Sequence, residues 1–208
     1  MNATYAYVFE LLQKHARTIV DYIILEPFSI DLYPLKFLGS KHTEPHHLIT
    51  PVESIVTLDE KDKKLLKFLN HHAHARIIDI SKETHLSSEL IVYKLKKLKE
   101  QGVFLGTRAY FNMKQFGYSY TLIFINFQYL TSANQEKLKR FAKNSPHIES
   151  ISFTFNKPNC YMQLFYQAET ELHQTLIEFK EFFKEESFTL EVIPLKNEGE
   201  YINTLPFL

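Results

Sequence analysis

Lysine residues are concentrated on one short segment, residues 86–106, in a way that could serve nucleic-acid binding. Lys94, Lys96, Lys97 and Lys99 lie within one helix length, between apolar residues at helical spacing. Cationic side chains along one helix can neutralise the phosphates of a nucleic-acid backbone, and such binding weakens with added salt. A solvated helix face can have the same composition. The elements around the segment must therefore decide between the two interpretations.

The composition restricts the class of protein. The chain has 208 residues, of which 45% are hydrophobic and 23% charged, as in a globular protein of one large or two small domains. The formal net charge is zero, which argues against a generally basic binder of nucleic acid but allows a local basic patch. Cys160 is the single cysteine and suits a reducing compartment. Neither a signal peptide nor an apolar run of roughly 20 residues is present, so we expect a cytoplasmic protein.

Residues 58–113 have the pattern of a winged helix-turn-helix. Helical spacing predicts helices over residues 58–70, 75–85 and 88–101, with Ser87 capping the third helix and Gly102 ending it. Residues 103–112 then read as two short strand-like pieces around Gly106 and Thr107. Three helices followed by a small β-hairpin is the plan of a winged helix-turn-helix.

Residues 118–195 predict a ferredoxin-like domain. The periodicity gives, in order, a strand at 119–130, a helix at 133–145, strands at 148–155 and 160–167, a helix at 169–186 and a strand at 187–195. This βαββαβ order makes an α+β fold, an antiparallel sheet with both helices on one face. The open face needs a cover, and a second copy of the chain would supply it. The sequence therefore predicts a homodimer or higher oligomer.

Residues 1–57 predict a helix-strand extension and a linker. Residues 18–25 read as a strand that should add to a sheet edge, because a single strand cannot stand alone, and residues 39–57 as a linker or irregular connection. Residues 9–38 and 179–208 share the order helix end, strand, proline-bearing piece and aromatic-Leu close. The extension is then either the remnant of a first regulatory module or an unrelated addition. We accordingly expect three parts: 1–57, 58–113 and 114–208.

Three sequence blocks support a more specific assignment. Leu58, Asp59, Asp62, Leu65 and Leu66 match the pattern L-D-x-x-D-x-x-I-L. Ala75, Arg76, Ile80, Ser81, Leu86 and Ser87 follow the order of A-R-x-x-x-x-x-[IL]-[AS]-x-x-x-x-[IL]-S, with two residues fewer between Arg76 and Ile80 than the pattern has. Lys94, Leu95, Lys97, Leu98, Gly102, Val103 and Gly106 fall in register with V-x-x-R-[IV]-x-[RK]-L-x-x-x-G-[IV]-I-x-G, Lys94 standing at the arginine. In these blocks and in its element order the chain resembles the leucine-responsive regulator/AsnC (Lrp/AsnC) family, over residues 58–195.

The resemblance implies a sequence-specific DNA-binding transcription regulator that dimerises through its ferredoxin-like domain, with no catalytic residue and no cofactor. The second helix of such a motif enters the major groove with its N-terminal residues towards the bases. Residues 58–113 hold eleven Lys and Arg against seven Asp and Glu, an excess of four positive charges. The expected DNA-binding residues are Ser87, Ser88, Glu89 and Tyr93 towards the bases, with Lys94, Lys97 and Arg108 on phosphates. Leu90, Val92, Leu95 and Leu98 are expected to face the core.

The family's effector site implies a second set of residues. Its turn between the second and third strands of the ferredoxin-like domain normally carries a glycine and an acidic residue that line an amino-acid site. Here the turn contributes Asn156, Lys157 and Asn159 as effector-binding candidates, with Pro158 among them. Without the glycine there is less room near the backbone, which puts amino-acid sensing in doubt.

Other chemistry has weaker support. His71, His72 and His74, with His46 and His47, lack the spacing and additional ligands that zinc needs, so no metal site is expected. Sirohaem decarboxylases that resemble this family offer an enzymatic alternative, for which the module supplies only Arg140, His147 and His173. A further alternative is an oligomerising co-regulator that barely contacts DNA, because Glu89 would repel phosphate. Absorbance in the Soret region on adding a tetrapyrrole would distinguish the enzyme.

Overall fold

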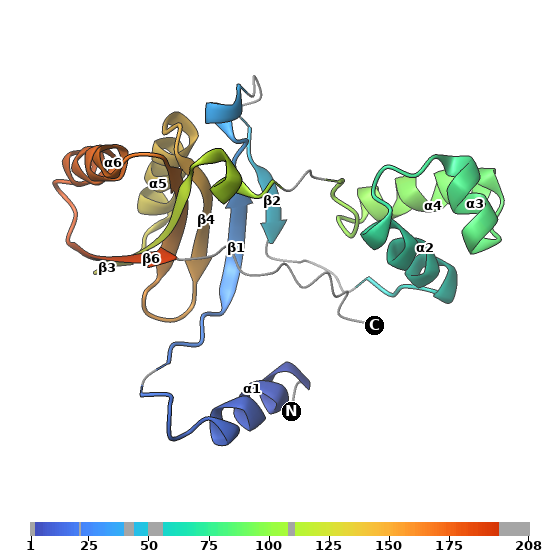
Figure 1. Cartoon of the computed structure of the whole chain (residues 1–208), viewed down its shortest axis with the longest axis horizontal. Helices are drawn as coiled ribbons and strands as arrows, with labels where there is room; N and C mark the ends of the chain where they lie inside the picture. Colours follow the sequence, from blue (N-terminus) through green and yellow to red (C-terminus); the bar gives the residue numbers. More distant parts are fainter. Residues whose placement is uncertain (1–2, 21, 40–43, 50–55, 108–110, 196–208) are drawn as a thin grey trace.

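The computed structural model describes residues 3–20, 22–39, 44–49, 56–107 and 111–195. Two structural units are evident in Figure 1: a cluster of three helices and a β-sheet with two helices on one face. The helical cluster consists of α2 (Glu60–His71), α3 (Ile77–Thr84) and α4 (Ser88–Glu100). The predicted helices over this part of the chain are therefore confirmed.

Local signals set the ends of these helices. Asp59 caps α2 and forms a reciprocal capping box with Asp62, whose backbone N–H lies 2.8 Å from the Asp59 carboxylate. Ser87 caps α4, and Gly102 follows its end at a φ of +69°, a conformation that glycine adopts without strain. The three helices enclose a small apolar core built around Leu65, Ile80, Ile91, Leu98 and their neighbours.

The predicted hairpin after α4 is not seen. Residues 103–107 and 111–112 are not in strands, and residues 108–110 lie outside the described residues. The backbone N–H groups of Val103 and Phe104 both donate to the carbonyl of Leu98, at 2.9 and 3.1 Å. Val103 and Phe104 therefore satisfy the end of α4, and the described residues do not test the hairpin expected around residues 108–110.

The ferredoxin-like order is confirmed. The elements are β3 (Ser119–Phe127), α5 (Ser132–Asn144), β4 (Ile148–Thr154), β5 (Cys160–Tyr166), α6 (Glu169–Phe182) and β6 (Phe188–Leu195). Neighbouring strands pair antiparallel in the order β4-β5-β3-β6, and α5 and α6 cover the same face (Figure 1). Rings from both layers meet in the core, among them Phe127, Phe141, Phe179 and Phe183.

The N-terminal extension contributes two further strands to this sheet. After α1 (Ala3–Lys14), β1 (Pro27–Leu32) pairs with the free edge of β4, and β2 (His46–Ile49) pairs with β1. A strand from the N-terminal extension thus lies at the sheet edge, but it is not the predicted one. The position predicted for that strand is wrong, because residues 18–20 and 22–25 are not in a strand.

The strand forms at Pro27–Leu32 and not at residues 18–25 for a local reason. Pro27 has no N–H to donate and therefore suits the first residue of a strand, and β1 begins at it. The segment from the helix end at Lys14 to the strand start at Pro27 is longer than the one from Phe182 to Phe188, so these helix-strand pairs differ in spacing, and residues 196–208 lie outside the described residues. Within the stretch expected to be a linker, His46–Ile49 form β2, and residues 40–43 and 50–55 lie outside the described residues.

The segment after β1 anchors the extension to the sheet domain. Tyr33 is 1% exposed and belongs to the main core. The Lys36 ammonium donates to the carbonyls of Ala142, Lys143 and Ser145 at the end of α5, and burial followed by the charge of Lys143 lowers its pKa. The ring of Phe37 lies 4.5 Å from that of Tyr118. The sheet domain therefore includes chain that precedes the helical cluster in sequence.

Candidate nucleic-acid interface

The turn between α3 and α4 is tightly specified. His85 adopts a left-handed conformation, with φ of 55°, and Leu86 beyond it is buried in the helical core. The Ser81 hydroxyl donates to the carbonyl of Leu86 at 2.6 Å, and the N–H of Leu90 donates to the Ser87 hydroxyl at 3.3 Å. These contacts fix the direction in which α4 leaves the turn, as a helix-turn-helix motif requires.

The residues predicted to face bases lie at the start of α4. Ser87, Glu89 and Tyr93 are exposed and Ser88 is half-buried. Hydrogen bonds from its own backbone N–H and from the Ser87 hydroxyl hold the pKa of the Glu89 carboxyl below its usual range. Glu89 is therefore an anion at neutral pH, placed where a recognition helix would meet DNA.

Lys94 does not serve the purpose predicted for it. Only 5% of this residue is exposed, and its ammonium lies 2.7 Å from a carboxylate oxygen of Asp59 and 2.7 Å from one of Asp62. A side chain held in this way cannot reach a phosphate, so its assignment as a phosphate contact is wrong. The misassignment arose because lysine is usually solvated, whereas this one is satisfied by two carboxylates.

This cluster accounts for both aspartates of the first sequence block and for one lysine of the third. Asp59 and Asp62 come from the first block and Lys94 from the third, so the ion pairs connect the start of α2 to the middle of α4. The hydrogen bond from Lys94, with that from the Asp62 backbone, lowers the pKa of Asp59 to about 2. Burial alone would lower the pKa of Lys94, but its hydrogen bonds to both carboxylates raise it. Asp59 and Lys94 are therefore both charged at neutral pH.

The inward face of α4 is rotated from the one predicted. Ile91, Lys94 and Leu98 are buried, Leu90 and Leu95 are half-buried, and Val92 is 55% exposed. The assignment of Val92 to the core is therefore wrong. Ile91 is buried in place of Val92. Lys94 can lie on the same buried face of α4 because Asp59 and Asp62 neutralise its charge.

The outward face of α4 remains cationic. Lys96, Lys97 and Lys99 are exposed. Lys96 lies 4.0 Å from the carboxylate of Glu100, whereas no ion pair involves Lys97 or Lys99 within the residues that the structure describes. Arg108, the predicted contact in the wing, lies outside the described residues. Lys97 thus keeps the geometry that a phosphate contact needs.

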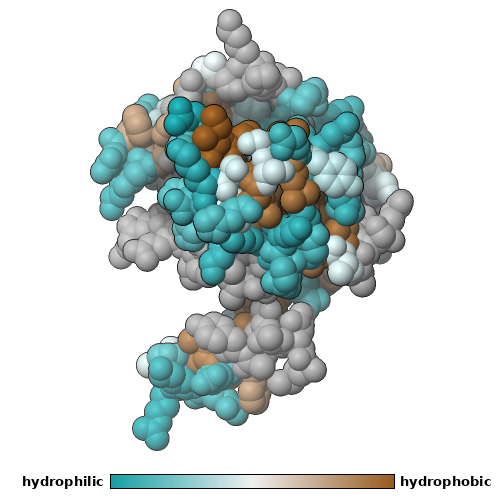
Figure 2. Space-filling model, turned by 90° about the vertical axis from the view of Figure 1, so that its right-hand side faces the viewer, coloured by the Kyte–Doolittle hydropathy of each residue, from teal (hydrophilic) through white to brown (hydrophobic). Residues whose placement is uncertain are grey.

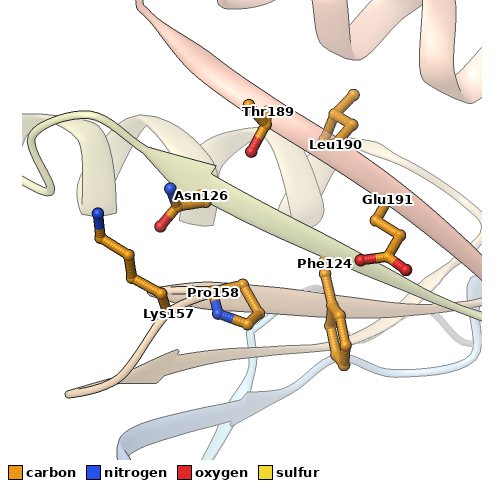
Figure 3. A pocket seen from close by; sticks show the side chains of 7 residues that line it. All are labelled: Phe124, Asn126, Lys157, Pro158, Thr189, Leu190 and Glu191. Atoms are coloured by element: carbon orange, nitrogen blue, oxygen red, sulfur yellow. The ribbon is translucent and has the colours of Figure 1, made fainter. Parts of the chain in front are cut away.

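A pocket of about 410 Å³ lies beside the turn between β4 and β5 (Figure 3). Its lining combines one cation and one anion with apolar surface: Phe124, Asn126, Lys157, Pro158, Thr189, Leu190 and Glu191. The Asn126 side-chain oxygen is buried and accepts no hydrogen bond from the described residues. Sequence reasoning found Lys157 but missed the β3 and β6 residues, which only the strand order brings to the turn.

The two asparagines predicted for an effector site have structural roles instead. Asn159 donates to the carbonyl of Phe127 at 2.8 Å and accepts from the N–H of Phe127 at 3.0 Å. Asn156 accepts from the N–H of Glu26 at 3.1 Å. They hold the turn to β3 and to the segment before β1, so Lys157 alone of the three lines the pocket.

The remaining titratable residues do not gather at a second site in the part of the chain that the structure describes. No group of three or more potential metal ligands occurs among the described residues, and His47 pairs with the buried Asp31 at 2.5 Å. Arg140 and His173 are exposed on α5 and α6, and neither they nor His147 line the pocket. Arg140, His147 and His173 therefore do not converge on the pocket to form a tetrapyrrole site.

Comparisons with known proteins agree with this geometry. A model for winged helix-turn-helix DNA-binding domains matches residues 58–104. The HTH-type transcriptional regulator FL11 of Pyrococcus abyssi is 33% identical over 106 residues, which are 51% of this chain and 67% of the regulator. The regulatory protein AsnC of Haemophilus influenzae is 20% identical over 140 residues, 67% of this chain and 93% of that one.

A solved structure extends the likeness to both domains. A Neisseria meningitidis transcriptional regulator in complex with L-Met covers 73% of this chain and 97% of its own, with a TM-score of 0.61 and 16% identity. The helix-turn-helix match and the two relatives together define a DNA-binding transcriptional regulator, and the solved structure shows the same fold in both domains. The chain belongs to the Lrp/AsnC family, and the relatives named above are regulators. In the described part of the chain, no helix is long and apolar enough to cross a bilayer.

Proposed function

We propose that this regulator binds its operator through the exposed side of α4, with Ser87, Ser88, Glu89 and Tyr93 towards the bases and Lys97 on a phosphate. The carrying observation is that α4 begins at a rigid turn and directs an exposed, lysine-rich face away from the domain core. Such a face supplies both parts of DNA recognition, cations for the backbone and polar side chains for base edges. We also propose that Arg108 contacts a phosphate from the wing.

The salt dependence of binding tests this assignment. We expect duplexes from the protein's own promoter to bind more tightly than random sequence, and Lys97→Ala to lower the slope of log K against log salt by about one. Fluorescence anisotropy over a salt series measures both quantities. Lys180→Ala, which removes an exposed lysine from α6, is the matched control and should leave the slope unchanged. Absence of binding at low salt would instead favour the co-regulator alternative.

We also propose that the chain forms a homodimer through the open face of the sheet. The half-buried apolar residues on that face come from four strands: Ile30, Leu32, Leu122, Phe124, Tyr161 and Ile193. The opposite face is covered by α5 and α6 (Figure 1). A second copy can cover the open face with equally apolar surface, and two helix-turn-helix motifs would then read two half-sites.

The pocket lies on the same open face, which connects the dimer to an effector. Lys157 and Glu191 provide opposite charges and Phe124 an apolar wall, a combination that suits a zwitterion with an apolar side chain such as methionine. Sedimentation velocity with and without methionine tests both proposals. We expect a dimer, a methionine-dependent shift to a different oligomer, and loss of that shift in Lys157→Met. A monomer at micromolar concentration would overturn the dimer, and an unchanged dimer would remove methionine as the effector.

A further inference from the structure

The outer ridge of α4 carries two large side chains that the domain does not use for folding. Glu89, Val92, Tyr93 and Lys96 follow one another at i, i+3, i+4 and i+7, the spacing of one helix face. Val92 is 55% exposed and Tyr93 62% exposed, and neither belongs to the core of the helical cluster. On the side of the molecule that this cluster forms, Figure 2 shows apolar surface surrounded by hydrophilic surface.

The surroundings of these two residues point to a nucleic acid as their partner. Lys96 lies on the same ridge, Lys97 and Lys99 flank it, and these three exposed lysines outnumber Glu89, the carboxylate at the start of the ridge. A partner that covers Val92 and Tyr93 must therefore present apolar groups between negative charges. The major groove of DNA does so, because the C5-methyl groups of thymine are its apolar groups and lie between two rows of phosphates.

We propose that Val92 and Tyr93 recognise thymine methyl groups, so that apolar contacts carry part of the operator specificity. Val92 has no hydrogen-bonding group in its side chain and can distinguish bases only by such contacts. The Tyr93 ring adds apolar area, and its hydroxyl can also donate to a base acceptor or a phosphate. This inference rests on the proposed binding of DNA through α4, and it assigns thymine to the base pairs that face the second turn of the helix.

Replacing thymine by uracil tests the inference directly, because it removes the methyl group and leaves base pairing unchanged. The probe is the duplex that the full-length protein selects from a random-sequence pool, with single thymines changed to uracil in turn. We expect about fourfold weaker binding for each contacted methyl, the value of one buried carbon group. Val92→Ala should bind the parent duplex more weakly and lose this discrimination at one or more of those positions, so that the two changes are not additive.

Two controls separate the outcomes. Ile177→Ala, which removes an exposed apolar side chain from α6, should keep the uracil discrimination, and Lys97→Ala should weaken binding to every duplex alike. Salt-dependent binding that is indifferent to uracil would overturn this inference and leave the proposed function standing. No binding to any duplex at low salt would overturn both. A change in sedimentation of Val92→Ala with unchanged discrimination would identify a protein-docking surface and also overturn the inference.

Discussion

Replacing Lys94 by methionine is expected to unfold the helical cluster, α2–α4. The methionine fills a similar volume but leaves the Asp62 carboxylate, which is 4% exposed, without its cation. Removing one partner of a buried ion pair costs about 3–5 kcal/mol, and whole domains are stable by only about 5–15 kcal/mol. A cluster this small should therefore lose most of its stability. Hydrogen exchange of peptides from residues 60–100 would locate the loss, and circular dichroism on heating would measure it.

Three further variants make the Lys94 result specific. Lys96→Met removes an exposed lysine from the same helix and should change the stability little. Lys94→Arg keeps the cation and should remain folded. Adding Asp62→Asn to Lys94→Met removes the uncompensated charge and should recover part of the loss. Equal stability of Lys94→Met and the unchanged protein would show that the ion pair does not hold α2 to α4.

The fate of Lys94 illustrates what helical periodicity reveals and what it does not. Spacing identified α4 and its capping residues from sequence. It did not identify the buried face, because Leu90, Ile91 and Val92 are consecutive and equally apolar. The structure selects Ile91, since only that rotation also brings Lys94 to Asp59 and Asp62. Lys94 is buried because it contacts Asp59 and Asp62, which lie 35 and 32 positions away in the sequence. A local sequence pattern cannot reveal such a contact.

Strand placement failed for a related reason. Residues 18–25 are rich in β-branched and aromatic side chains, whereas β1 contains a proline, a serine and an aspartate. Intrinsic preference therefore favoured the wrong segment. The position of β1 depends on its partners, the free edge of β4 and the anchoring residues Tyr33 and Lys36. Strand preference is dominated by such tertiary context, which is why the existence of an N-terminal strand was predictable and its register was not.

Tyr33→Ala is expected to destabilise the sheet domain by about 3–5 kcal/mol, the usual loss for a large aromatic side chain removed from a core. Tyr33 is 1% exposed and packs in the main core, although it precedes the helix-turn-helix in sequence. Its hydroxyl donates to the carbonyl of Lys139 at 3.3 Å, and burial raises the pKa of that hydroxyl. Tyr33→Phe keeps the ring and should cost only about 1 kcal/mol.

The comparison with an exposed tyrosine decides whether residues 27–38 are part of the regulatory domain or an accessory. Tyr129→Ala removes a side chain that is 72% exposed from the same domain and should leave thermal unfolding nearly unchanged. If Tyr33→Ala behaves like Tyr129→Ala, the extension merely lies against a domain that is stable without it. If it unfolds the sheet domain, β1 and its anchor complete a core that the βαββαβ unit does not fill alone. The second result is expected, because Tyr33 packs among core residues of that unit.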